Sequence, residues 1–177
     1  MQEFCQSQNW RFCFIGGLAV QRWGQPRFTK DADLTLLTGF GREASFVDTL
    51  LNVFPGRRAD AREFALRYRV LLLKEQTGIS FDIALGALPF EENCVGRATL
   101  WPVSENASLL TCSADDLIVH KAFAARDVDW SDVESILMRQ GNKLNFDLIW
   151  SELRPLIELK EDPAIETRLR TLMARCL

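Results

Sequence analysis

The chain has 177 residues, of which 47% are hydrophobic and 25% are charged, proportions that are ordinary for a soluble globular protein. This length suits one domain, or a core with an appendage. The formal net charge of -3 and the isoelectric point near 5.3 argue against the broad basic surface that dominates affinity for nucleic acids.

The cysteine and histidine content argues against a structural zinc site. Five cysteines are odd in number and form no CxxC pair, and the only histidine is His120. The N-terminal residues lack a basic segment followed by a long apolar one, and nowhere do 18 apolar residues follow one another. We therefore expect a cytoplasmic protein with reduced thiols that is neither exported nor membrane-spanning.

The first third of the chain alternates between short predicted elements. Residues 2–9 predict a short helix, and the alternation of residues 10–15 predicts a strand. The pair Gly16-Gly17 opens a helix that ends at the Gly-Gln-Pro sequence of residues 24–26. A polar loop then leads into a second strand, residues 31–37.

This second strand carries two carboxylates. Its apolar residues share one face, whereas Asp31 and Asp33 share the other face with Thr35. Residues i and i+2 of a strand lie about 6.5 to 7 Å apart, so the two carboxylates can hold hard cations between them. The preceding Gly16-Gly17 helix start presents bare N–H groups and the positive end of the helix dipole, which suits a polyphosphate.

The middle of the chain continues the pattern of helix and strand. Residues 42–54 predict a helix that covers the sheet, and residues 57–63 a charged connection. Residues 66–74 and 79–85 predict two strands joined by a hairpin connection at Glu75-Gln76-Thr77-Gly78.

A lone carboxylate, Asp82, lies at the middle of the less apolar face of the strand predicted for residues 79–85. A short helix, residues 88–97, and edge strands at residues 99–103 and 108–112 follow. After them the pattern is helical throughout.

The change in composition places a soft boundary near Ser104. It divides a core, residues 1–103, from a helical region, residues 104–177, which packs on the core or belongs to the same domain. The four helices predicted in this region open at Ser113, Asp129, Asn145 and Asp162.

The three carboxylates Asp31, Asp33 and Asp82 predict a metal site. If their strands are neighbours, they converge near the Gly16-Gly17 turn. Two divalent cations held about 3.5 to 4 Å apart stabilise the attacking and leaving oxygens of an in-line phosphoryl displacement. Magnesium is the expected ion, because it takes oxygen ligands and keeps substrate phosphates in its shell.

Each part of this pattern has a simpler interpretation. An Asp-x-Asp pair is commonly solvated or paired with basic groups, here Arg27 and Lys30. A Gly-Gly sequence is also typical of a tight turn that needs small residues and binds nothing. The metal interpretation depends on the combination of the turn, the paired carboxylates and Asp82.

The order of strand, Gly-Gly, helix, R-x-T-x-D-x-D (residues 27–33) and a later strand with one further aspartate resembles the nucleotidyltransferase superfamily, which includes DNA polymerase beta and the minimal nucleotidyltransferases. The sequence SADDLIVHKAFAARDVDWSDV, residues 113–133, looks like the bacterial branch related to the toxin half of abortive-infection toxin–antitoxin systems. The resemblance implies an α/β fold of the α+β kind, with a mixed sheet, flanking helices and a C-terminal helical region.

The resemblance also implies roles for individual residues. Gly16 and Gly17 would hold the nucleotide phosphates, although many relatives have serine at the second position. Asp31 and Asp33 would bind both metals, and Asp82 would bind the catalytic metal and help to activate the acceptor hydroxyl.

Further residues match the family pattern outside the carboxylate motif. Lys121 resembles the lysine that contacts the triphosphate, and its alternative is an exposed helical lysine. Arg27 and Thr29 resemble a pair that binds nucleotide and shapes the metal loop, and Arg27 alternatively pairs with Asp33. The remaining residues that match less closely are candidates for interhelical ion pairs: Arg126, Asp129 and Asp132.

The expected function is Mg²⁺-dependent transfer of a nucleoside monophosphate from a nucleoside triphosphate to an acceptor hydroxyl, with release of pyrophosphate. The acceptor stays open among transfer RNA, a protein and a small molecule such as an aminoglycoside, and the resemblance adds a protein partner of the antitoxin type. Two alternatives are a catalytically inactive interaction or regulatory subunit of the same fold, and an Asp-cluster hydrolase of phosphate esters.

Overall fold

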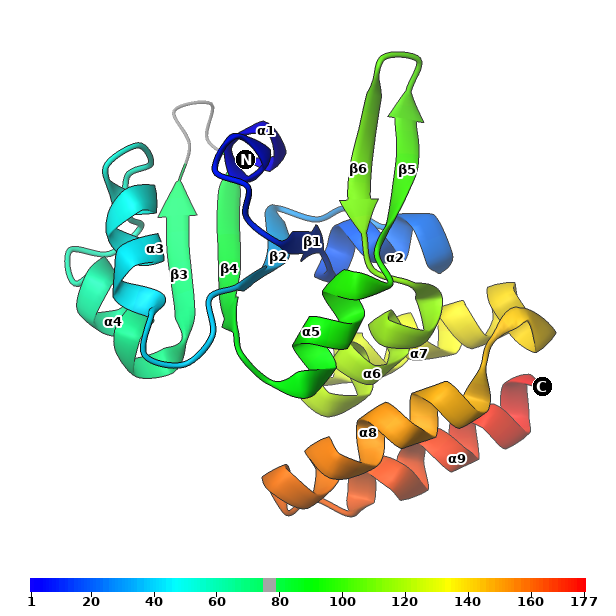
Figure 1. Cartoon of the computed structure of the whole chain (residues 1–177). Coiled ribbons are helices and arrows are strands. Elements are labelled where there is room, and N and C mark those ends of the chain that lie inside the picture. The colour runs from blue at the N-terminus through cyan, green and yellow to red at the C-terminus, as the bar shows by residue number, and fades with distance from the viewer. Residues whose placement is uncertain (75–78) are drawn as a thin grey trace. The chain divides into compact units, whose positions relative to one another are not determined.

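The computed structural model describes residues 1–74 and 79–177 (Figure 1). The hairpin connection predicted at Glu75-Gln76-Thr77-Gly78 lies outside the described residues. The chain forms two compact units, each built from two segments. Unit 1 consists of Met1–Leu18 and Phe28–Cys112, and unit 2 of Ala19–Arg27 and Ser113–Leu177.

A mixed sheet forms the centre of unit 1. The strands in the described residues are β1 (Phe12–Phe14), β2 (Asp31–Leu37), β3 (Val70–Lys74), β4 (Ser80–Gly86), β5 (Thr99–Ser104) and β6 (Ala107–Thr111). They lie in the order β3-β4-β2-β1-β6-β5, and β5 and β6 extend beyond the other strands (Figure 1). The pairs β2–β4 and β1–β6 are parallel, and the other pairs are antiparallel.

Helices flank this sheet, which confirms the predicted fold class. They are α1 (Gln2–Ser7), α3 (Glu43–Leu51), α4 (Ala61–Tyr68) and α5 (Pro89–Gly96). Helix α3 contacts α4, α4 contacts β3, and α5 contacts β1 and β2. Helix α2 (Gly16–Trp23) starts in unit 1 and continues into unit 2.

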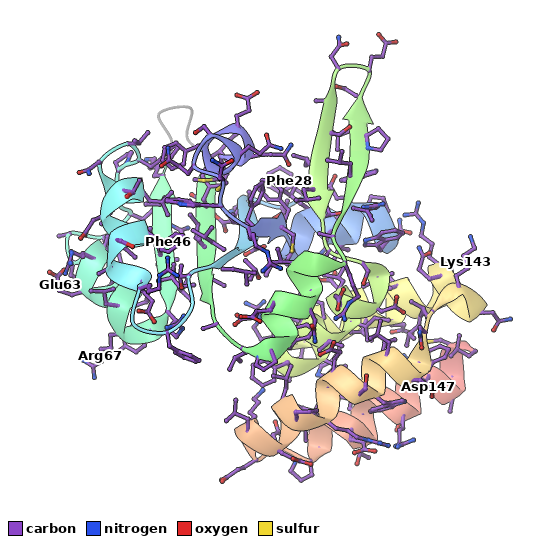
Figure 2. All side chains as sticks on the ribbon, viewed as in Figure 1. Phe28, Phe46, Glu63, Arg67, Lys143 and Asp147 are labelled. Carbon is purple, nitrogen blue, oxygen red and sulfur yellow. The ribbon has the colours of Figure 1, made fainter. Side chains whose placement is uncertain are left out.

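Helix α4 corrects the prediction of a charged connection followed by a strand from residue 66. Within α4 only Ala61 and Ala65 are buried, so its apolar face is too small to give a helical pattern in the sequence. Figure 2 shows Glu63 and Arg67 of this helix pointing away from the sheet. The helix ends at Arg69, whose φ of 56° is left-handed, and β3 begins only at Val70.

The core of unit 1 follows the alternation in its two central parallel strands. Leu34 and Leu36 of β2 are fully buried, and so is Ile83 of β4. Burial of each such side chain contributes about 1.5 to 3 kcal/mol. The opposite face of the same strands carries the carboxylates, which are only partly buried.

Unit 2 is helical, as predicted for the end of the chain. Ser113 caps its first helix by accepting the N–H of Asp116 at 3.1 Å, and Asn145 caps a later one by accepting the N–H of Leu148 at 3.0 Å. Its elements are the end of α2, α6 (Ala114–Ala124), α7 (Asp127–Gln140), η1 (Gly141–Lys143), α8 (Phe146–Lys160) and α9 (Ala164–Cys176).

No helix in the described part of the chain combines the length and apolar character needed to cross a bilayer.

The central strand β2 gives a test of this core. Leu34→Ala is expected to lower the free energy of unfolding by about 2 to 5 kcal/mol, because a fully buried leucine leaves a cavity between strand and helices. Denaturation in urea measures the change. The matched control is Leu100→Ala, since the Leu100 side chain is 60% exposed and its loss should change stability by about 0.5 kcal/mol or less.

Candidate functional site

The pairing of β2 with β4 brings the three predicted carboxylates to one face of the sheet. The two strands are parallel, and their register places Asp33 opposite Asp82 and Asp31 opposite Ser80. Residues opposite each other on neighbouring strands point to the same face, and the strands lie about 4.8 Å apart. Asp31, Asp33 and Asp82 therefore form a compact group, which is called the carboxylate cluster below.

Arg57 joins two members of this cluster and was not predicted. Its Nη1 lies 3.3 Å from Oδ1 of Asp31, and its Nη2 contacts Oδ1 of Asp82. A single guanidinium group thus bridges the carboxylates of Asp31 and Asp82. The sequence shows Arg57 only as one of several charged residues in a connection, so no local pattern distinguishes it from Arg58 or Arg62.

The third carboxylate, Asp33, faces the glycine turn. The N–H of Gly17 donates to Oδ2 of Asp33 at 3.3 Å, which directs the N-terminus of α2 at this side chain. Gly16 has a φ of +55°, and a Cβ atom built there would overlap the Asp33 carboxylate. Only glycine allows the turn to approach Asp33 this closely.

Thr29 fills the space beside Gly17. A Cβ atom at position 17 would lie 2.6 Å from Oγ1 of Thr29, too close for any side chain. The same hydroxyl donates to the main-chain oxygen of Asp31 at 2.8 Å. Thr29 therefore has two contacts: its side chain packs against the glycine turn, and its hydroxyl group holds the main chain of Asp31, the first residue of β2.

Burial and the neighbouring Arg57 act in opposite directions on the pKa of the Asp82 carboxyl group. Burial raises the pKa of Asp82 above its ordinary value of 3.8, the charge of Arg57 opposes this, and the nearby Asp31 adds to it. The raised pKa is therefore due first to burial, which the attraction of Arg57 offsets only in part.

The donor chemistry of the cluster fits a hard divalent cation. Its ligand atoms are all carboxylate oxygens, the type that Mg²⁺ prefers, and two of these carboxylates already bind a cationic group. Within residues 1–74 and 79–177, no group of three or more His, Cys, Asp or Glu side chains is arranged around a common metal position. Asp33 bonds to Gly17 while the other two carboxylates bond to Arg57, so binding a shared ion requires these side chains to reorient.

Lys121 lies in a buried charged cluster of unit 2. It is only 5% exposed, so the interpretation as an exposed helical lysine is wrong. Its Nζ lies 2.9 Å from Oδ1 of Asp129 and 2.8 Å from Oδ2 of Asp132. Arg27 binds both carboxylate oxygens of Asp132 at 2.8 Å, and Nε of Arg126 lies 2.6 Å from Oδ2 of Asp129. Lys121 of α6 thus forms ion pairs between helices with Asp129 and Asp132 of α7. Arg126 instead pairs with Asp129 at the start of α7 itself.

These contacts set the protonation of the two buried aspartates. Burial alone would raise their pKa, but hydrogen bonds from Arg126 and Lys121 outweigh it for Asp129, and those from Arg27 and Lys121 outweigh it for Asp132. Both carboxyl groups thus have a pKa below their ordinary value of 3.8 and are ionised in the folded protein.

The residues singled out from the sequence are distributed over both units. Unit 2 contains Arg27 and Lys121. Unit 1 contains Gly16, Gly17, Thr29, Asp31, Asp33 and Asp82.

Comparison with solved structures identifies the fold. The chain superposes on an antigenic nucleotidyltransferase-like protein from Paracoccidioides brasiliensis with a TM-score of 0.52 and 16% identity, over 95% of this chain and 88% of the other. It superposes on the antibiotic-resistance factor ANT(2'')-Ia with a TM-score of 0.55 and 16% identity, over 94% of this chain and 91% of the other. No family model and no curated protein sequence matches the chain. The class that these likenesses define is the nucleotidyltransferase-like fold.

The approach of the turn to Asp33 can be tested with Gly16→Ala. We expect a loss of about 2 to 4 kcal/mol in the free energy of unfolding, because the new methyl group meets the Asp33 carboxylate and alanine is strained at this φ. Urea denaturation gives the value. Gly39→Ala is the control: Gly39 has a similar φ of +70° but nothing within 4 Å, so it reports backbone strain alone. Equal losses in the two variants would contradict the close approach.

The buried cluster of unit 2 predicts a pH-dependent effect of Lys121→Met. At neutral pH the variant is expected to lose about 3 to 5 kcal/mol, because Asp129 and Asp132 keep their charge without this partner. Each lowered pKa contributes stability that is present above 3.8 and is lost as the pH falls through the folded value. The difference from the wild type should therefore shrink between neutral pH and a pH well below 3.8.

Urea titrations at both pH values measure this difference. The control is Lys143→Met, since Lys143 is an exposed lysine of unit 2 (Figure 2) and its loss should leave stability nearly unchanged at either pH. A gap between the wild type and Lys121→Met that stays constant with pH would rule out the ion pairs as its origin.

Proposed function

We propose that this protein is a magnesium-dependent nucleotidyltransferase, which transfers a nucleoside monophosphate from a nucleoside triphosphate to an acceptor hydroxyl. One observation carries the proposal: the β2–β4 register sets Asp33 opposite Asp82, with Asp31 on the same face, beside the Gly16-Gly17 turn. The nucleotidyltransferase-like fold supports it.

In the proposed site, Asp31, Asp33 and Asp82 would hold the metal. Bound Mg²⁺ supplies positive charge to the phosphates and lowers the pKa of the acceptor hydroxyl. The acceptor oxygen forms a bond to the α-phosphorus, the bond from that phosphorus to the bridging oxygen of pyrophosphate breaks, and pyrophosphate leaves. Asp82 takes the proton of the acceptor hydroxyl.

The nucleotide phosphates are proposed to bind at the start of α2. Gly16 and Gly17 are the first residues of this helix, and the N-terminus of a helix favours negative charge. Thr29 contributes a hydroxyl beside the turn, where Gly17 has no side chain. The two glycines thus serve both a steric and a binding role.

Arg27 and Lys121 are the further proposed phosphate ligands. In this structure Arg27 binds Asp132, and Lys121 binds Asp132 and Asp129. Contact with a triphosphate therefore requires each of them to exchange a carboxylate for a phosphate oxygen, an exchange between two anionic partners.

The proposed acceptor is a hydroxyl group of a small molecule, a transfer RNA or a protein. ANT(2'')-Ia is described as an antibiotic-resistance factor, which keeps a small-molecule acceptor among the candidates beside transfer RNA and protein. The net charge of -3 disfavours long duplexes. An antitoxin-type partner and a cytoplasmic location stay predictions from the sequence.

The proposal predicts that Asp33→Asn loses about a hundredfold or more in transfer rate. Stability should change little, because the asparagine oxygen still accepts the N–H of Gly17. The measurement is transfer of label from α-labelled nucleoside triphosphates to components of a cell extract with Mg²⁺. Asp48→Asn is the control, since Asp48 is an exposed residue of α3 that pairs with Arg62.

The same assay separates the alternatives. Absence of labelling by the wild type, together with no magnesium-dependent shift of melting by nucleotide, would contradict the enzyme and favour an inactive interaction subunit. Products that contain water-derived oxygen and form without any acceptor would favour the hydrolase instead.

A further inference from the structure

We propose that Arg57 is the resident counter-ion of the carboxylate cluster and competes with the divalent cation for it. The inference rests on the proposed function, because it concerns the same carboxylates. In the metal-free protein Arg57 holds Asp31 and Asp82 together, and binding of the metal displaces it.

The backbone around Arg57 is fixed beside the sheet. The N–H of Arg57 donates to the main-chain oxygen of Leu72 at 3.0 Å, and the N–H of Lys74 donates to that of Pro55 at 2.9 Å. Gly56 forms an antiparallel bridge with Leu73 between them. Residues 55–57 thus extend the sheet beyond β3 and determine where the arginine side chain starts.

This anchorage aligns Arg57 with the cluster. Leu72 is the register partner of Asp82 in the β3–β4 pair, so Arg57, Leu72 and Asp82 lie side by side across the sheet. The main chains of Arg57 and Asp82 are therefore about 10 Å apart, a distance that an extended arginine and an aspartate span together. The contact follows from the sheet and not from a chance surface rotamer.

Gly56 keeps this segment close to α4. A Cβ atom at Gly56 would lie 2.5 Å from the Cβ of Ala61, the first residue of α4, so the segment packs where no side chain fits. The position of Arg57 is held from two sides, by β3 and by α4.

Competition follows from the atoms involved. Arg57 binds Oδ1 of Asp31 and Oδ1 of Asp82, which are two of the carboxylate oxygens available to a shared metal ion. Two cations at one position repel each other, and the Arg57 side chain is only 25% exposed, so solvent screens this repulsion incompletely. The neighbouring Arg58 instead pairs with Asp60, outside the cluster.

The direct test is a calorimetric titration of the full chain with Mn²⁺ alone. Arg57→Gln is expected to bind Mn²⁺ about three- to tenfold more tightly than the wild type, because two partly exposed ion pairs no longer have to be broken. Arg58→Gln removes the same charge one residue away and should bind like the wild type. Arg57→Lys keeps the charge but has a single nitrogen, and its affinity should lie between those of the wild type and Arg57→Gln.

Thermal melting gives a second readout that is independent of catalysis. Without metal, Arg57→Gln should melt below the wild type, because Asp31 and Asp82 repel each other without their counter-ion. Saturating Mn²⁺ should raise its melting temperature by more than it raises that of the wild type. A purely structural role of Arg57 would leave the rise caused by metal unchanged.

The outcomes separate this inference from the proposed function. Metal binding by the wild type with equal or weaker binding by Arg57→Gln overturns the competition and leaves the nucleotidyltransferase proposal intact. An equal gain in Arg58→Gln assigns the effect to net charge and also overturns it. Failure of the wild type and all variants to bind Mn²⁺, with or without nucleoside triphosphate, overturns both proposals.

Discussion

The parallel pairing of β2 with β4 is the constraint on which the site depends. A slip of one residue in this register would turn Asp82 toward the core and bring Ile83 to the opposite face. The buried leucines and isoleucine on the core side oppose such a slip, because each would lose about 1.5 to 3 kcal/mol of burial. The apolar face of the sheet therefore determines the position of the acidic residues on the other face.

Aspartates that lie close together repel one another unless cationic groups or hydrogen-bond donors compensate their charge. The two units provide these partners in different ways. In unit 1 the carboxylates are partly exposed, two of them share Arg57, and Asp33 accepts a backbone N–H. In unit 2 the aspartates are buried, and cations from three side chains keep both ionised. The first arrangement leaves its carboxylate groups partly open to solvent, whereas the carboxylates of the second are buried and paired with cations of the same unit. This difference explains why only the first is a candidate metal site.

The sequence predicted those parts of the fold that leave a local periodic pattern. The bounds of β2 and the faces of Asp31 and Asp82 follow from strict alternation, and the sheet confirms them. The role of Arg57 depends on bonds between residues 55–57 and β3, which no spacing in the sequence reveals. The burial of Lys121 was not predicted, because a lysine in a helix is usually exposed. Helix α6 is buried on most of its sides, so its sequence has no distinct polar face that would separate buried from exposed positions.

Because the glycine turn contacts Thr29, the residue at position 17 limits which residue fits at position 29. A side chain at position 17 needs the volume that the threonine hydroxyl and methine occupy, so the two sites cannot both be large. In this chain, a serine at position 17 would therefore require a smaller residue at position 29 or a shift of the loop that carries Thr29. Placing a hydroxyl group in the glycine turn is therefore a paired exchange, because the threonine hydroxyl beside the turn has to be removed at the same time.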